Sequence, residues 1–447
     1  MAIEQSRALA LLAALTFTGS VQYAQEESAE VPTELEEAEP ARSPRDQAIW
    51  ILRSIREPEP PLADPVADLT KLVALTADDL VSYLRDRRVP ALEDEPSQTL
   101  SIYQHELILD ALSQSEPATT MAATSRMLTA SSGGSAVAAA IEVYGATGES
   151  GQLSTIRALL AGLEEEQWSK RLERSLQQAV ASIIRGDYRA QGLLLSSWRD
   201  WKPEHLTGVI RGIGASRDPR GLEFLGEILY WEPDHVHLAL SQVRLLGPSR
   251  VEFIDKPITE TVREMLDTED ARIRKAALLA LGDLQDLESV PRMIEILSEE
   301  GTGERENAVW ALQRITGVRL NDQAQTWKTW FDMESKWYSR VGTVMAKLSS
   351  PDDADVFGAI RELSTHYLHK DELAQAVSEC LTHSNPKIRA TACKGLARLK
   401  SSVAVPVLIS RLDDRDERVQ FAARKALISL TGEERGPYSE DWEELRR

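Results

Sequence analysis

Cysteine is nearly absent from this sequence, with two residues among 447. A disulfide scaffold, a four-thiolate zinc site and an iron–sulfur cluster each need more thiols than that, so all three are excluded. Cys380 and Cys393 lie on consecutive expected helices, at distances from the turn near Ser384 that differ by about four residues, or roughly 6 Å along a helix. This mismatch strains a disulfide, and we expect buried free thiols.

Positive charge is also scarce: Lys and Arg number 51 against 71 Asp and Glu, a formal net charge of −20. Affinity for phosphate backbones comes from basic side chains that displace counterions. We therefore expect no nucleic-acid partner. Seven of the glutamates fall within residues 26–39, among prolines, in a stretch that cannot bury enough apolar surface to fold. Residues 25–65 are predicted to be an acidic, proline-rich disordered linker with a short helix around Trp50.

Long apolar runs are missing as well, and this excludes an integral membrane segment in the main body. Residues 8–17 form a ten-residue apolar run after Arg7, which matches a signal-peptide core and is too short to span a bilayer. No cysteine follows that could accept a lipid. We expect residues 1–24 to be a signal peptide, with cleavage near Ser20 as an alternative, and a periplasmic or extracellular protein. An uncleaved N-terminal helix would instead leave the protein in the cytoplasm.

Catalytic motifs are absent too. The sequence contains no Gly-rich phosphate loop, no Gly-x-Ser-x-Gly elbow, no His-Glu-x-x-His helix and no Cys-x-x-Cys pair. Carboxylate pairs are abundant, but in a chain with 71 acidic residues they carry little information. The sequence thus predicts no catalytic residue and no cofactor.

What the sequence does contain is helical periodicity and an internal repeat. From residue 66 onward, apolar residues recur at three- and four-residue spacing in segments of 12–18 residues, with no convincing strand pattern. Residues 262–327 match residues 377–442 at a constant offset of 115 residues without a gap. The matched identities include Ile273-Arg274 with Ile388-Arg389, Val290-Pro291 with Val405-Pro406, Thr316-Gly317 with Thr431-Gly432, and Trp327 with Trp442. The fold is predicted to be all-α, and its C-terminal part to have arisen by duplication.

Each copy contains a shorter period of 31 residues, because Ala280-Leu281 recurs as Ala311-Leu312. This is the length of one helical hairpin in a stacked array. Asp270 and Asn385 are candidate N-caps of the second helix in their hairpins. Arg274 and Arg389 follow four residues later, where they can face the first turn and brace successive units.

These residues resemble the HEAT-repeat family, specifically the short HEAT-like units first noted in phycobiliprotein lyases, of the armadillo type. The motif is Asp270-x-x-Ile273-Arg274-x-x-Ala277-x-x-Ala280-Leu281-x-x-Leu284, with copies from Asn385 and from Asp416. Departures are Thr391 at a usual small apolar site and Gln420 in place of the arginine. The resemblance is specific for residues 258–445 and compatible for 66–257. It implies an α-α superhelix, a solenoid of stacked hairpins that binds partners, and by itself implies no lyase activity.

Tryptophans recur at a fixed distance from a helix stop. Trp327-x-x-Trp330 begins ten residues after Gly317, and Trp442 follows Gly432 in the same way, with Trp198-x-x-Trp201 as a diverged copy. Two roles fit these tryptophans: an aromatic platform that binds a ligand, or plugs that fill the junctions between modules. Their helical spacing favours the second role. They divide the body into modules 66–201, 202–337 and 338–447.

One metal hypothesis remains, formed by two pairs one helical turn apart: His366 with His369, and Cys380 with His383. The duplication weakens it, because Cys380 and His366 correspond to Met265 and Val251, which are apolar. The two pairs should also lie more than ten ångströms apart along a helix. We therefore assign no metal ligand.

Charge placement supplies the only candidate binding residues. Between Asn385 and Lys425 the chain carries ten basic residues against four acidic ones, within a protein of net charge −20. If the second helices of the hairpins line the inner surface, part of this set forms a basic stripe. The candidates are Lys387, Arg389, Lys394, Arg398 and Arg424. The alternative is an ordinary solvated helix face.

These observations favour a non-enzymatic scaffold that binds a protein partner, with an acidic protein as the candidate, in the envelope of a bacterial cell. The alternative is an accessory subunit resembling the HEAT-like phycobiliprotein lyases. Nucleic-acid binding, as in HEAT-like DNA glycosylases, is a third and weaker interpretation, because both the charge and the export signal oppose it.

Overall fold

Helical hairpins make up nearly all of the chain that can be described. The computed structural model describes residues 42–55, 64–92, 95–128, 133–248, 252–299 and 303–446, and residues 44–447 form one compact unit. The predicted signal peptide and most of the predicted linker lie outside these residues. The all-α prediction is confirmed: the strands of the described part are two short antiparallel segments, β1 (Arg88–Val89) and β2 (Gln98–Thr99).

An N-terminal block of four helices comes first: α1 (Pro44–Ser54), α2 (Pro65–Asp86), α3 (Ile102–Gln114) and α4 (Pro117–Met127). α1 is the short helix expected inside a disordered linker, but the structure corrects that placement. Its apolar face, which includes Ile49 and Leu52, is buried and packs on α2. Because the apolar residues of α1 recur at helical spacing, this helix can join the core although glutamates and prolines flank it.

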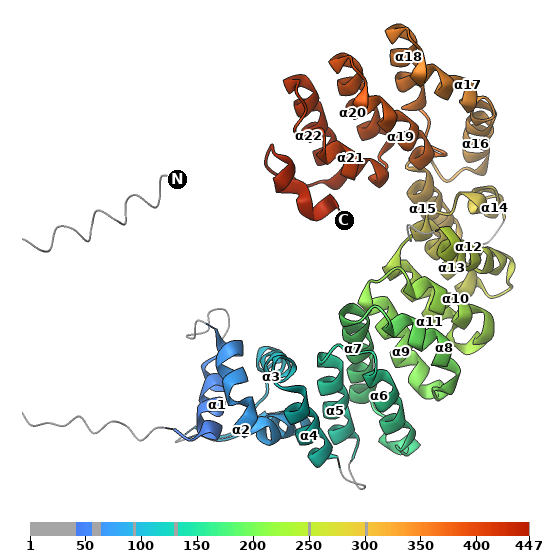
Figure 1. The fold of residues 1–447 in the computed structure, drawn as a ribbon. Helices are drawn as coiled ribbons and strands as arrows, with labels where there is room; N and C mark the ends of the chain where they lie inside the picture. Colours follow the sequence, from blue (N-terminus) through green and yellow to red (C-terminus); the bar gives the residue numbers. More distant parts are fainter. Residues whose placement is uncertain are drawn as a thin grey trace, which may run out of the picture. The chain divides into compact units, whose positions relative to one another are not determined.

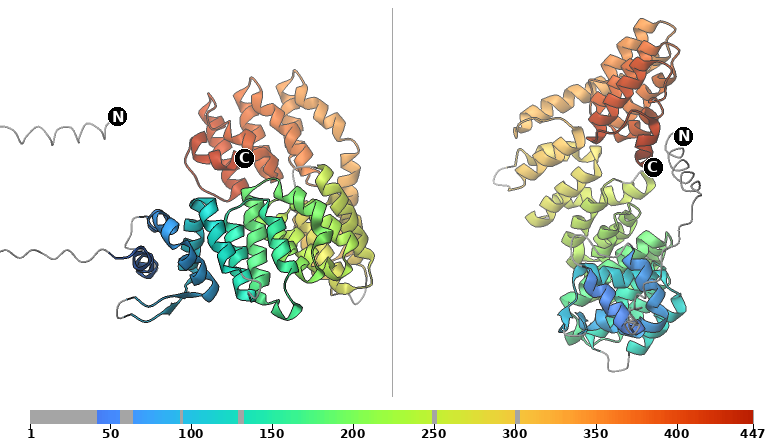
Figure 2. Two further views of the ribbon diagram at one scale, coloured as in Figure 1. Left: turned by 60° about the horizontal axis from the view of Figure 1, so that its bottom comes forward. Right: turned by 90° about the vertical axis from the view of Figure 1, so that its left-hand side faces the viewer.

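From α5 onward the helices alternate between two rows (Figures 1 and 2). The first row consists of α6 (Gln152–Ala161), α8 (Ala190–Ser197), α10 (Gly221–Trp231), α12 (Glu252–Glu264), α14 (Val290–Ile296), α17 (Val341–Ala346), α19 (Lys370–Glu379) and α21 (Val405–Ile409). The second row consists of α5 (Gly134–Ala146), α7 (Lys170–Gly186), α9 (Pro203–Ser216), α11 (Val236–Leu246), α13 (Ala271–Leu284), α15 (Arg305–Thr316), α18 (Asp353–Leu363), α20 (Pro386–Leu399) and α22 (Glu417–Thr431). One longer helix, α16 (Ala324–Tyr338), lies between α15 and α17.

The helices of the second row pack on one another along the array. Neighbouring helices pack on one another from α5 to α15 and again from α18 to α22, and each is covered on one side by a first-row helix. Small residues permit this packing: a Cβ on Gly145 would lie 2.5 Å from Ala179 Cα, and one on Gly212 would lie 2.6 Å from Val180 Cβ. What remains exposed on each second-row helix is therefore a stripe on the side away from the first row.

The duplicated segments have the same local structure, as the sequence predicts. Asp270 and Asn385 cap α13 and α20, and each accepts a hydrogen bond from the backbone N–H two residues on, at 2.8 and 2.9 Å. α15 and α22 end at Gly317 and Gly432, whose φ angles of 73° and 75° lie in the left-handed region that glycine tolerates.

Three apolar cores follow one another along the chain. The N-terminal core draws on α1 to α5, the central core extends from Val137 to Trp327, and the C-terminal core from Trp337 to Trp442. The change from the central to the C-terminal core falls within α16, between Trp327 and Trp337, near the boundary expected at 337. The predicted boundary at 201 is no break, because Trp198 and Trp201 are buried inside the central core. The close packing of α7 on α9 carries that core past this position.

Candidate protein-binding surface

Three of the predicted partner-binding residues lie on the exposed stripe of α20. Lys387, Lys394 and Arg398 are exposed and share one helical face. α20 contains no acidic residue. In the described part of the chain, no carboxylate lies within 4 Å of any of these three cations, as the ion pairs of this region involve other residues.

Arg389 is not part of this surface, which corrects the prediction. Its side chain is buried, and its guanidinium donates to both carboxylate oxygens of Asp414, at 2.9 and 2.6 Å, and to the carbonyl of His383 at 2.9 Å. The residue sits four positions after the helix cap, where the side chain points to the next hairpin. Arg389 therefore braces the array, as was expected of it and of Arg274.

Arg274 makes the equivalent brace in the first copy. Its guanidinium donates to Glu304 Oε1 at 2.9 and 3.2 Å and to the carbonyl of Thr268 at 3.3 Å. Arg424 has an internal role as well: its guanidinium donates to the carbonyl of Arg435 at 2.8 and 3.2 Å. Two of the five predicted binding residues, Arg389 and Arg424, are thus engaged within the molecule.

Two further cations extend the α20 stripe on its neighbours. Arg361 on α18 and Lys425 on α22 are exposed and stand nine residues after their helix caps, as Lys394 does. A Cβ on Gly395 would lie 2.4 Å from Ser364 Oγ, which places the adjacent Lys394 and Arg361 at a similar level. We call Arg361, Lys387, Lys394, Arg398 and Lys425 the C-terminal basic face.

An exposed aromatic ring lies within this face. Phe421 on α22 is 68% exposed, and Lys425 Nζ lies 5.8 Å from its ring centroid. A phenylalanine exposed to this degree contributes little to the fold, because burial is what makes an apolar side chain stabilising. The C-terminal basic face therefore combines unpaired positive charge with one accessible apolar group.

Some exposed arginines elsewhere, such as Arg305, also lack a carboxylate within 4 Å in the described residues, but many others are neutralised by one. Examples are Arg126 with Asp78 at 2.9 Å and Arg199 with Glu227 at 3.1 Å. Such surface pairs are worth little in stability, yet they cancel the local field. Against this background, the five cations of the C-terminal basic face concentrate a positive potential in a protein of net charge −20.

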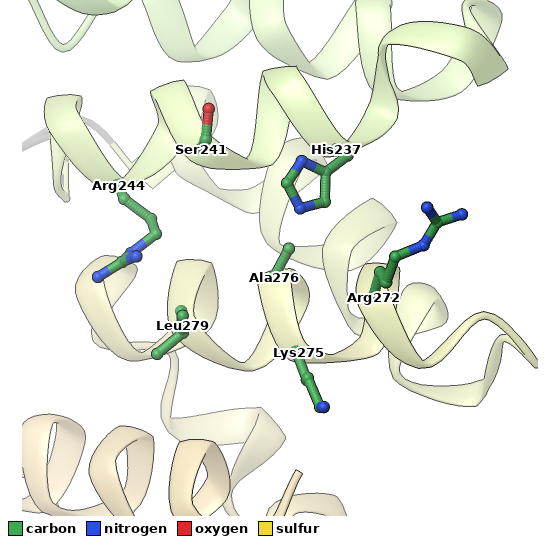
Figure 3. Close-up of a pocket in the computed structure, with 7 residues that line it drawn as sticks. All are labelled: His237, Ser241, Arg244, Arg272, Lys275, Ala276 and Leu279. Carbon is green, nitrogen blue, oxygen red and sulfur yellow. The ribbon is translucent and has the colours of Figure 1, made fainter. Parts of the chain in front are cut away.

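A groove between α11 and α13 was not anticipated from the sequence (Figure 3). Its volume is about 250 Å³. The lining residues are His237, Ser241 and Arg244 from α11, and Arg272, Lys275, Ala276 and Leu279 from α13. Three other cavities, of about 360, 210 and 160 Å³, each include carboxylates in their lining, whereas this one includes none. The residues that line this groove recur at three- and four-residue spacing on both helices, and this spacing is the sequence pattern that indicates a shared face on each helix.

The repeat tryptophans are structural. Trp327 and Trp442 are fully buried, and each indole N–H donates to the backbone carbonyl six residues earlier, at 2.8 and 2.9 Å. Trp330 is half-buried and packs edge-on against Trp327, with ring centroids 6.0 Å apart. The interpretation as plugs at the ends of modules fits these contacts, and buried rings are no ligand platform.

The four residues weighed as metal ligands have other contacts. His366 stacks on Trp337 with ring centroids 3.5 Å apart and hydrogen-bonds to Glu334 at 2.9 Å, while His369 stacks on Tyr338. Cys380 lies in the C-terminal core, and the described residues contain no group of three or more ligating side chains placed to hold an ion. These histidine contacts connect the C-terminal end of α16 to the segment between α18 and α19.

Both cysteines are free and buried, as predicted. Burial raises the pKa of the Cys380 thiol to about 11 and that of Cys393 to about 12. The thiolate is the reactive form of cysteine, so both side chains act as apolar packing groups at neutral pH. None of the described helices is long and apolar enough to cross a bilayer.

Comparison with known proteins gives a family match and distant structural neighbours. Residues 237–313 and 343–434 match the family model of HEAT repeats. No curated protein matches the chain in sequence. Among solved structures, the chain is similar to the karyopherin Kap121p bound to the extreme C-terminus of the protein phosphatase Cdc14p, with 11% identity and a TM-score of 0.33 over 90% of this chain and 47% of that one. Kap121p bound to Nup53p gives 12% identity and a TM-score of 0.32 over the same shares.

The chain thus spans a little less than half the length of these karyopherin chains. The family match covers α13, α20, α22 and most of α15, the helices that carry the duplicated caps and braces. Residues 237–313 and 343–434 are therefore HEAT repeats, and they lie in an α-solenoid of two alternating rows of helices.

Proposed function

We propose that this protein is a non-enzymatic HEAT-repeat scaffold that binds an acidic segment of a partner protein on its C-terminal basic face. The helical repeat array supports the scaffold role. The observation that carries the acidic partner is the set of five exposed cations on three adjacent helices, none of which has a carboxylate within 4 Å in the described residues.

The physical argument concerns what these charges do for the fold. Like charges on one surface repel one another and stabilise nothing by themselves. Many exposed arginines elsewhere on this protein have acidic partners, so the chain has carboxylates available for pairing. A partner that supplies carboxylates would remove the repulsion and gain charge-assisted hydrogen bonds.

Two alternatives receive less support. A nucleic acid would also find the basic face attractive, but the net charge of −20 lowers its affinity for the protein as a whole. A lyase-like accessory role would need a group that acts on a substrate, and no observation on the described residues favours one.

Direct binding tests the proposal. We would measure fluorescence anisotropy of a labelled decaglutamate peptide and of a labelled DNA duplex at about 150 mM salt, where long-range screening is strong. The variant Lys394→Glu/Arg398→Glu reverses two charges of the face. Its matched control, Arg305→Glu/Arg319→Glu, reverses two exposed arginines outside it.

The expected result is that the wild type and the control bind decaglutamate and that the Lys394→Glu/Arg398→Glu variant binds at least tenfold more weakly. Equal binding by all three proteins would rule out the basic face. Duplex DNA bound more tightly than decaglutamate would replace the protein partner by a nucleic acid.

We also propose that the protein is exported, on the strength of the apolar run at residues 8–17. Fractionation of the native cells followed by N-terminal sequencing of the recovered protein tests this. A mature N-terminus between residues 20 and 26 in an envelope or secreted fraction is expected. An intact precursor in the cytosol would contradict export.

A further inference from the structure

The groove between α11 and α13 has an apolar floor. Ala276 and Leu279 from α13 form this floor together with the aliphatic parts of the longer lining side chains. Figure 3 shows Arg244 and Arg272 at opposite ends and His237 between them, while the ammonium group of Lys275 points away from the groove. The shape is that of an apolar slot bracketed by two guanidinium groups.

Both arginines have acidic neighbours in the same array. Arg244 Nε lies 3.0 Å from Asp283 Oδ2, and its guanidinium carbon lies 5.5 Å from the ring centroid of Trp310. These contacts restrict Arg244, which therefore loses less conformational entropy on binding a ligand than a freely rotating side chain does. Arg272 Nη2 lies 3.3 Å from Asp270 Oδ2, but its side chain is exposed and can reorient toward a ligand.

The arginines keep donors for a ligand despite these pairs. A guanidinium has five N–H donors, and Arg244 and Arg272 each use only some of theirs in the ion pairs just described. The local charge is also positive, because Asp283 is shared between Arg244 and Arg314, at 3.0 and 3.4 Å. Lys275 adds a further charge and has no carboxylate within 4 Å in the described region.

The spacing of the arginines sets the size of the ligand. α11 and α13 are neighbouring second-row helices, so His237 lies level with Arg272, near the starts of the helices, and Arg244 lies level with Leu279. Seven residues of helix separate the two levels, which is about 10 Å along the axis. Because the arginines lie on different helices, whose axes are about 9 Å apart, their Cα atoms are about 13 Å apart. An extended peptide covers about 13 Å in four residues, and side chains at every second position face the same way.

We propose that this groove anchors the acidic partner by taking one apolar side chain flanked by two carboxylates four residues apart. The apolar side chain lies on Ala276 and Leu279, and the carboxylates accept hydrogen bonds from Arg244 and Arg272. The inference rests on the proposed function, since it describes how the same class of partner is recognised. It places the recognition of the apolar side chain on helices other than those of the C-terminal basic face.

A pair of labelled peptides tests the groove on the full chain. The first is Gly-Glu-Ser-Leu-Ser-Glu-Gly, and the second has serine in place of leucine. Fluorescence anisotropy gives the affinity of each for the wild type, for Leu279→Asp in the floor and for Arg272→Glu at the rim. Arg305→Glu on α15 is the matched charge-reversal control, and Arg272→Glu keeps the test valid if Leu279→Asp unfolds, because the Arg272 side chain is 84% exposed.

We expect the leucine peptide to bind the wild type about tenfold more tightly than the serine peptide, as the burial of one leucine side chain predicts. This preference should disappear in Leu279→Asp, both affinities should fall in Arg272→Glu, and Arg305→Glu should behave as the wild type. Equal binding of the two peptides to the wild type, or a preference that survives both groove variants, overturns the inference. Decaglutamate separates the two proposals: if it binds while the leucine preference is absent, only the groove fails, and if nothing binds, the proposed function fails too.

Discussion

The two copies of the duplicated segment, residues 262–327 and 377–442, share their skeleton and differ in what they expose. Caps, glycine stops and the indole hydrogen bonds of Trp327 and Trp442 recur at matched positions. On the surface, Arg272 of the first copy is paired with Asp270, whereas Lys387 at the matched position of the second copy has no such partner in the described residues. Function in a repeat protein resides in the sites grafted on the fold, and here the proposed sites lie where the copies diverge.

The ionic braces show a subtler divergence. Arg274 pairs with Glu304, thirty residues on, and Arg389 pairs with Asp414, twenty-five residues on. These carboxylates do not occupy matched positions in the duplication. The arginine and its task have been kept while the carboxylate is supplied from a different part of the following loop, which indicates that bracing the next hairpin is what the fold requires.

The largest expected effect comes from breaking the more buried brace. Arg389→Ala leaves Asp414 buried without its partner, and removing one member of such a pair costs about 3–5 kcal/mol. Arg274→Ala should cost less, because the Arg274 side chain is 23% exposed and that of Arg389 is 11% exposed. Urea unfolding followed by circular dichroism gives both values.

The matched control for this comparison is the double variant Arg389→Ala/Asp414→Asn, which removes the unpaired charge and should recover part of the loss. Equal destabilisation by Arg389→Ala and Arg274→Ala would show that burial does not set the strength of these braces.

A smaller effect is expected at the tryptophans. Trp327→Phe and Trp442→Phe keep an aromatic ring but remove the hydrogen bond to the carbonyl of Asn321 or Gly436. Each should lose about 1–3 kcal/mol, through an unsatisfied buried carbonyl and a smaller ring. Hydrogen exchange read by mass spectrometry should show α16 loosened by the first change and the chain end loosened by the second. Loosening of both regions by either change would contradict separate junctions.

Acid should weaken the second copy through its brace. Burial alone would raise the pKa of Asp414, but the hydrogen bonds from Arg389 outweigh it and hold the pKa below its usual value. A carboxyl group with a lowered pKa contributes stability that is present above about pH 4 and is lost as the pH falls through the folded-state pKa. We expect the urea midpoint to fall as the pH drops below about 4. Asp414→Asn should lack this component, and an identical acid profile in that variant would assign it to other groups.

The sequence predicted the regular features of this fold because each has a local cause. Helical spacing, the caps at Asp270 and Asn385 and the 115-residue register all follow from short-range chemistry that the structure reproduces. Three of the five candidate residues, Lys387, Lys394 and Arg398, are exposed on one helix face for the same reason. The sequence could not separate them from Arg389 and Arg424, because whether a cation is exposed depends on loops that return from elsewhere, such as the one that carries Asp414. The groove was missed because it needs two helices side by side.

The smallest expected effect on stability is also the sharpest test of the comparison between the copies. Lys394→Glu/Arg398→Glu changes exposed side chains that have no ion pair in the described structure, so the unfolding free energy should move by less than about 0.5 kcal/mol. Relief of repulsion among the remaining cations could even raise it slightly. The same variant should lose at least tenfold in affinity for decaglutamate. Thermal unfolding and anisotropy on one sample decide the matter, because a surface kept for binding loses affinity without losing stability, whereas a merely solvated helix face loses neither.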